Sequence, residues 1–61
     1  MQMTKGQARK SGAKAGTAMA RGDEQAAHRE YQRMVRFASI DVRDIWQAAY
    51  REAYARSKAN G

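Results

Sequence analysis

The side chains of this chain that could take part in chemistry are mainly basic and aromatic. Twelve Lys or Arg residues stand against six Asp or Glu, which gives a formal net charge of +6. Residues 1–22 hold five of the basic residues and no acidic residue. A one-sided basic segment of this kind is typical of proteins that bind phosphate-rich partners. The charge distribution therefore indicates nucleic-acid binding, with a solvated basic tail as the alternative.

The candidate phosphate ligands lie on two predicted helices. Lys10, Lys14 and Arg21 share one side of the first segment, and the next helix repeats this arrangement with arginines. Arginine suits the role because its planar guanidinium grips phosphate with two hydrogen bonds and stacks on bases. The expected RNA- or phosphate-binding residues are Lys5, Arg9, Lys10, Lys14, Arg21, Arg29, Arg33 and Arg36. For the arginines of the second helix, where acidic residues are interspersed, a solvated helix face is an equal alternative.

Aromatic side chains gather near the C-terminal end. Residues 46–55 contain the only Trp and two of the three Tyr. Trp46 shares an apolar stripe with Ala49, so we expect it in the core, where one Trp can bury about 200 Å². Tyr50 and Tyr54 lie at the edge of that stripe. They either pack against the first helix or a second copy of the chain, or form a stacking platform for RNA bases.

Side chains suited to catalysis are scarce. His28 is the only His and there is no Cys, which excludes disulfides and a zinc site built from Cys or several His. We expect His28 to be exposed on the polar side of a helix. Asp41 and Asp44 fall in the first turn of a predicted helix, where capping and the helix dipole explain both. We therefore expect no enzymatic activity, no metal site and no cofactor.

Three helices must position these side chains. The absence of Pro and of hairpin turn pairs between alternating runs argues against strands. In the first segment, about residues 5–20, Ala and Gly recur at helical spacing. Its two glycines weaken that helix but permit close approach to another surface. Two longer apolar stripes with a period of 3.6 residues follow. The first is Ala27, Tyr31, Met34, Val35 and Ala38, and the second is Val42, Ile45, Trp46, Ala49 and Ala53.

The helix boundaries predict how these segments are joined. Gly22 and Asp23 can cap the second helix, and Asp41 can cap the third. Ile40 and Ile45 have the spacing of a hydrophobic staple across that third start. Because so few residues separate the last two helices, we expect them to fold back as an αα-hairpin.

The predicted fold class is therefore all-α, a small three-helix protein. We expect a single domain over residues 1–61, in which a basic Ala/Gly-rich segment (1–22) is packed on or tethered to a helical hairpin (23–61). A chain of this length buries only about 60% of its unfolded surface, so a partner or a homodimer is the expected source of extra stability. No apolar run approaches the length of a signal-peptide core or a membrane span. A cytoplasmic protein without membrane contact is expected.

Two stretches resemble the ribosome modulation factor family. The first reads Ala8-x-x-x-Gly12-x-x-Ala15-Gly16-x-Ala18, and the second reads Trp46-x-x-Ala49-Tyr50-Arg51-Glu52-Ala53. The chain departs from the family pattern in lacking a Pro-containing loop, in the longer spacing between the stretches, and in having Ala49 where the family favours Gly. The resemblance implies a small helical ribosome-binding protein that suppresses translation and promotes hibernating ribosome dimers.

The sequence thus predicts a non-enzymatic regulator that binds RNA, with the ribosome and its rRNA as the main partner. One alternative is a protein-binding adaptor or inhibitor, of the kind phages and mobile elements encode, which acts through the aromatic and small-residue surface. The other is a small DNA-binding protein, although the chain has no recognisable helix-turn-helix or other reader motif.

Overall fold

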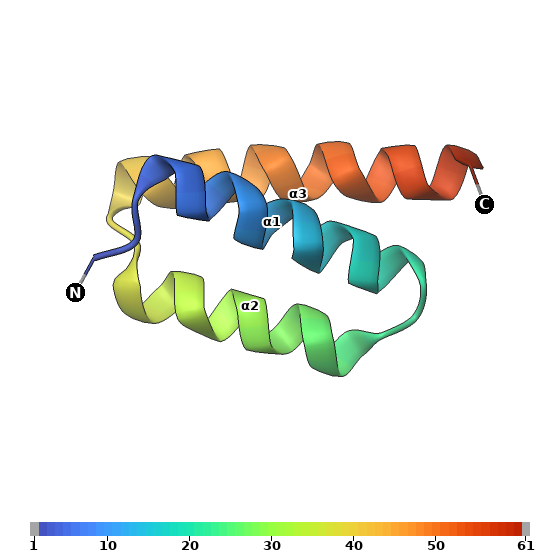
Figure 1. Ribbon diagram of the computed structural model, residues 1–61, viewed down its shortest axis with the longest axis horizontal. Coiled ribbons are helices and arrows are strands. Elements are labelled where there is room, and N and C mark those ends of the chain that lie inside the picture. Colours follow the sequence, from blue (N-terminus) through green and yellow to red (C-terminus); the bar gives the residue numbers. More distant parts are fainter. Residues whose placement is uncertain (1, 61) are drawn as a thin grey trace.

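The protein is a bundle of three α-helices joined by short turns (Figure 1). The computed structural model describes residues 2–60, so Met1 and Gly61, the ends of the expected domain, lie outside the described residues. The helices are α1 (Lys5–Ala20), α2 (Glu24–Phe37) and α3 (Ile40–Asn60). The predicted all-α, three-helix fold is confirmed. Within residues 2–60 no helix is both long and apolar enough to cross a membrane.

The first helix is the centre of the packing. Figure 1 shows that α1 and α3 run in the same direction and that α2 runs back against them. The largest interface joins α1 to α3, a smaller one joins α1 to α2, and α2 hardly touches α3. The predicted short connection between α2 and α3 is therefore present, but both helices pack on α1 rather than on each other. The Ala/Gly-rich segment is packed on the hairpin rather than merely tethered to it.

The starts of α1 and α2 are capped by their own side chains. The Thr4 hydroxyl accepts from the Gln7 backbone N–H at 3.1 Å, and the Gln7 side chain accepts from the Thr4 N–H at 2.9 Å. This reciprocal pair is a capping box, which satisfies two backbone donors that the helix cannot pair internally. Asp23 accepts from the Ala26 N–H at 3.2 Å, so its predicted capping role is confirmed.

The start of α3 differs from the prediction. The helix begins at Ile40, and the Ser39 carbonyl accepts the first intrahelical bond, from the Arg43 N–H at 2.8 Å. Ser39 thus holds the capping position, and Asp41 lies inside the first turn, where its charge still suits the helix dipole. The predicted staple is wrong, because Ile40 is 79% exposed and therefore does not fix how the chain enters the helix.

The buried face of α2 is rotated relative to the predicted stripe. Ala27 and Met34 are buried as predicted, but Tyr31 is 49% exposed and Val35 is 42% exposed. Glu30 takes their place in the interior. The reason is that α2 packs on α1 and not on α3, so the face turned toward α1 is the buried one. The stripe of α3 fits its prediction better, since Val42, Trp46 and Ala53 are all buried.

Polar contacts fasten the ends of α2. The backbone N–H of the buried Met3 donates to the Phe37 carbonyl at 2.7 Å. The Arg43 guanidinium donates to the carbonyls of Val35, at 2.9 Å, and Ala38, at 3.2 Å. These bonds satisfy carbonyls at the C-terminal end of α2 that have no intrahelical partner. Together they hold the segment before α1 and the start of α3 against the same helix end.

Two glycines of α1 lie directly against the backbone of α3. A Cβ built on Gly12 would overlap the Trp46 carbonyl oxygen, and one built on Gly16 would overlap the Tyr50 carbonyl oxygen. The two glycines are one helical turn apart, as in the small-residue patterns that let helix backbones approach closely. At this distance Cα–H groups can contact carbonyl oxygens directly. The close approach predicted for this segment is confirmed.

Replacing either glycine by alanine should destabilise the fold. Gly12→Ala and Gly16→Ala raise the helix propensity of α1, but each new methyl group must push α1 and α3 apart. Overpacking typically costs about 1–3 kcal/mol, and a backbone obstacle cannot move aside as a side chain can, so we expect about 2 kcal/mol or more for each variant. Urea unfolding followed by circular dichroism measures the change.

Gly6→Ala is the matched control. Gly6 also lies in α1, but a Cβ there meets nothing within 4 Å. This variant should gain up to about 1 kcal/mol of stability from its better helix propensity. Equal changes in the free energy of unfolding for Gly6, Gly12 and Gly16 variants would show that the α1–α3 contact does not limit the fold.

Candidate functional site

A buried hydrogen-bonded chain connects all three helices. Trp46, on α3, is only 4% exposed, so its predicted place in the core is confirmed. Its indole N–H donates to the Ser11 hydroxyl of α1 at 2.9 Å, and that hydroxyl donates to Glu30 of α2 at 2.8 Å. Each polar atom is thereby paired, as burial requires. The chain fixes the rotation of each helix about its own axis.

Glu30 also brings together basic side chains of two helices. Lys14 Nζ of α1 lies 3.8 Å from Glu30 Oε2, and Arg33 Nη1 of α2 lies 3.5 Å from Glu30 Oε1. The carboxylate is nearly buried, whereas the side chains of Lys14 and Arg33 are 71% and 58% exposed. A single acidic residue thus anchors one cation from each helix at the surface. The basic faces of α1 and α2 meet at this position.

The residues predicted to bind phosphate all lie at the surface. Lys5, Arg9, Lys10, Lys14, Arg21, Arg29, Arg33 and Arg36 are exposed. The contacts at Glu30 bring Lys14 and Arg33 together. Sequence reasoning did not assign Glu30 a role. Its i, i+3 spacing to Arg33 is visible in the sequence, but the contact to Lys14 requires knowing that α1 packs beside α2.

Four aromatic rings form a row beside the core. The rings of Trp46 and Tyr50 are nearly parallel, with centroids 5.4 Å apart, and those of Tyr50 and Tyr54 are nearly parallel at 6.3 Å. Tyr31 of α2 meets Trp46 edge to face at 6.1 Å. The row therefore runs along α3 and crosses to α2 at its Trp46 end.

The spacing of this row bears on the role of Tyr50 and Tyr54. A base inserted between two rings needs roughly 6.8 Å between them, twice the ~3.4 Å rise of stacked bases. The spacings on both sides of Tyr50, 5.4 and 6.3 Å, are smaller. The arrangement favours packing for Tyr50. Tyr54 ends the row, is partly exposed, and has Lys58 Nζ 5.7 Å from its ring centroid.

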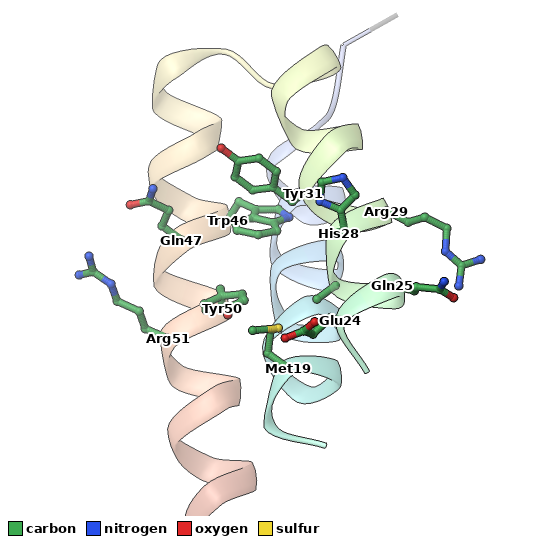
Figure 2. Close-up of a pocket in the computed structure, with 11 residues that line it drawn as sticks. Met19, Glu24, Gln25, His28, Arg29, Tyr31, Trp46, Gln47, Tyr50 and Arg51 are labelled. Carbon is green, nitrogen blue, oxygen red and sulfur yellow. The ribbon is translucent and has the colours of Figure 1, made fainter. Parts of the chain in front are cut away.

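An open groove lies between α2 and α3. Figure 2 shows the side chains that line it, with the rings of Tyr31 and Trp46 next to one another and Met19 of α1 at one end. Its volume is about 980 Å³. Arg29 and Arg51 stand on opposite sides and point outward. The sequence did not predict this groove, because the αα-hairpin expectation placed α2 and α3 in direct contact. The sequence feature that hints at the groove is Tyr31. Its large ring belongs to the apolar stripe of α2, and the small side chains of α1 are too short to cover it.

The three side chains considered for acid–base or metal chemistry are exposed: His28, Asp41 and Asp44. His28 lies at the surface, as predicted, where it borders the groove. Asp41 and Asp44 are both exposed, but only Asp41 lies in the first turn of α3, so the predicted first-turn position of Asp44 is wrong. Among residues 2–60 no group of three or more His, Cys, Asp or Glu side chains is placed to hold a metal ion. The basic faces of α1 and α2 and the groove are the candidate functional surfaces.

Comparisons of the chain with protein-family models, with curated proteins and with solved structures find no match. The stretches that carry the resemblance to the ribosome modulation factor family, residues 8–18 and 46–53, lie on α1 and α3. They contact one another where Gly12 meets Trp46 and Gly16 meets Tyr50. This contact is a feature of the packing and assigns no family, so the resemblance stays a prediction.

The hydrogen-bonded chain predicts the effect of Ser11→Ala. The substitution leaves the indole N–H of Trp46 without an acceptor and removes a donor from Glu30. A buried polar group left unpaired costs about 1–3 kcal/mol, so the free energy of unfolding should fall by that amount. Urea unfolding monitored by Trp46 fluorescence measures it. Ser57→Ala, on α3 and outside this chain of bonds, should change stability by less than about 0.5 kcal/mol. A Ser11 variant as stable as the Ser57 variant would show that the chain contributes nothing.

Proposed function

We propose that this protein is a non-enzymatic RNA-binding regulator and that its main target is the ribosome. The observation that carries the proposal is the meeting of the basic faces of α1 and α2 at Glu30. Two separate helices thereby contribute to one cationic surface, which a single basic helix or a flexible tail would not provide.

The charge of α1 supports this proposal. The helix contains four Lys or Arg residues and no Asp or Glu. Its buried side is made of Ala, Gly and Ser, so its cations do not serve the core. Any attraction to a polyanion is therefore not opposed by acidic groups on the same helix, and it can also speed association.

The contacts at Glu30 leave Lys14 and Arg33 available to a ligand. Their distances of 3.8 and 3.5 Å to the carboxylate exceed the ~2.7–2.9 Å of a strong charge-assisted hydrogen bond. Because the Lys14 and Arg33 side chains are largely exposed to water, their attraction to Glu30 is screened and contributes little to stability. A phosphate group can therefore bind to these cations while Glu30 keeps its hydrogen bond to Ser11.

The rigid packing of α1 favours binding of a structured RNA. Because Gly12 and Gly16 hold α1 tightly on α3, the cations are presented on a fixed scaffold. A preorganised surface loses less conformational entropy on binding than a disordered tail does. Folded RNA is recognised largely by its shape and by contacts to phosphates and 2′-hydroxyls. In this proposal the protein acts by occupying such a surface, and ribosomal RNA supplies the target.

Removing charge from α1 and its C-terminal end tests the proposal. Lys10, Lys14 and Arg21, changed together to Gln, should weaken binding to purified ribosomes and leave helix content unchanged. The slope of log affinity against log salt should shrink by about 0.7–0.9 for each phosphate that the variant no longer neutralises. Co-sedimentation with ribosomes over a series of salt concentrations measures both quantities.

The control removes the same charge from α3. Arg51, Arg56 and Lys58, changed together to Gln, lower the net charge equally but lie on the helix that contributes no predicted phosphate ligand. This variant should keep most of the affinity and the salt slope. The proposal is wrong if the α1 variant keeps the wild-type slope, or if the two variants lose affinity equally. Competition by duplex DNA as strong as that by ribosomal RNA would favour the DNA-binding alternative.

A further inference from the structure

The groove between α2 and α3 is a second surface, distinct from the basic one. Its apolar lining comes from all three helices: Met19, Ala27, Tyr31, Trp46 and Tyr50. It stays open because α2 and α3 each pack on α1 and barely contact one another. Tyr31 is the most exposed of these five residues, at 49%. A groove with such walls can accept an apolar ligand face without rearrangement of the fold.

The groove and the basic surface use different sides of α2. Among the eight residues predicted to bind phosphate, Arg29 is the one that lines the groove in the described structure. Glu30, which anchors Lys14 and Arg33, faces α1 instead. A ligand in the groove would therefore leave those two cations free. The two surfaces can be occupied together.

The aromatic row makes a nucleobase a poor occupant. Trp46 is nearly buried, and Tyr50 has a ring on each side at a spacing too small to admit a base. The rings instead form a continuous apolar wall. Aliphatic side chains pack on such a wall through area alone, at about 25 cal/mol for each Å² buried.

The charges at the rims select the chemistry of the occupant. Arg29 on α2 and Arg51 on α3 stand on opposite sides of the groove (Figure 2), and Glu24 is the acidic residue of the lining. A ligand with an apolar face between acidic flanks complements this pattern. A second copy does not, because it also carries a net charge of +6 and its α2 has arginines on the outer side.

The dimensions suit a helix. On α2 the lining of the groove runs from Glu24 to Tyr31, which is about two turns, or roughly 11 Å at 1.5 Å per residue, so the groove can take about two turns of an added helix. An added helix would lie between α2 and α3 and complete a four-helix arrangement over α1. This is the helix-in-groove mode, in which apolar residues at i, i+3, i+4 and i+7 enter the groove.

We propose that the α2–α3 groove binds an amphipathic helix of a partner protein whose apolar stripe is flanked by acidic side chains. The protein then couples two partners, a phosphate-rich one on the α1–α2 face and an acidic helix in the groove. The coupling of two partners rests on the RNA-binding proposal. Binding in the groove does not, because Arg29 is the one predicted phosphate ligand that lines the groove in the described structure.

Two designed peptides test the groove. Both are helical, about 16 residues long, free of Trp, and carry Leu at i, i+3, i+4 and i+7; one has Glu and the other Lys at the flanking positions. Trp46 is the only Trp and lines the groove, so its emission reports binding. The Glu-flanked peptide should bind about tenfold more tightly than the Lys-flanked one. Arg29→Glu combined with Arg51→Glu should reverse that preference.

The control variant combines Lys5→Glu with Lys10→Glu, which changes the net charge equally at exposed positions outside the groove. It should keep the preference for the Glu-flanked peptide. Tyr31→Ala should weaken that peptide about tenfold, since buried aromatic anchors dominate such interfaces. Circular dichroism of each variant verifies that it is folded.

Four results would overturn the inference. The first is a loss of preference for the Glu-flanked peptide in the control variant that is as large as in the Arg29→Glu, Arg51→Glu variant. This indicates that the peptide is attracted by the net charge of the protein and not by the groove. The second is no response of Trp46 to the Glu-flanked peptide. The third is a dimer in sedimentation equilibrium that the Arg29 and Arg51 reversal abolishes, which makes a second copy the occupant. The fourth is a shift of Trp46 emission on addition of single-stranded RNA that disappears in the Arg29→Glu, Arg51→Glu variant, which makes RNA the occupant.

Discussion

The contact of Gly12 and Gly16 with the α3 backbone is the constraint on which the rest of the structure depends. It makes α1 the central helix, although α1 has the smallest side chains of the three. Because the backbones of α1 and α3 are so close, the core between them is thin and consists largely of Ala and Gly. Trp46 supplies most of the apolar volume that such a core lacks. Its indole then needs a polar partner, which Ser11 provides.

The fold was largely predictable because its local signals agree with its tertiary contacts. The span of α1, the cap at Asp23 and the burial of Trp46 follow from spacing and side-chain type alone. The start of α3 was misplaced by two residues because Ser39 and Asp41 are about equally good capping residues, and the helix begins directly after Ser39. The rotation of α2 could not be predicted, because it depends on which neighbouring helix α2 packs against.

The candidate surfaces divide in the same way. Charge is a property of composition, so the basic residues of α1 and α2 could be identified from the sequence and all lie at the surface. Their convergence at Glu30 could not, because a buried carboxylate with partners on two helices arises only in three dimensions. The groove also escaped prediction. It exists because α2 and α3 barely contact one another, whereas the expected hairpin placed them side by side. The large ring of Tyr31 in the stripe of α2 is the sequence feature that hints at it.

The order of the helices along the chain has a consequence for the folding of the newly made protein. The main interface joins the first helix to the last, and its buried hydrogen bond links residues separated by 35 positions. Helical proteins usually fold through local contacts, which keeps the entropy cost of loop closure small. Here α1 and α2 leave the ribosome first, and they share only the smaller interface. The Ala/Gly-rich face of α1 can be buried only after α3, with Trp46, has been synthesised. Until then the basic helix α1 has only its smaller interface with α2, and the surface it will bury against α3 is uncovered.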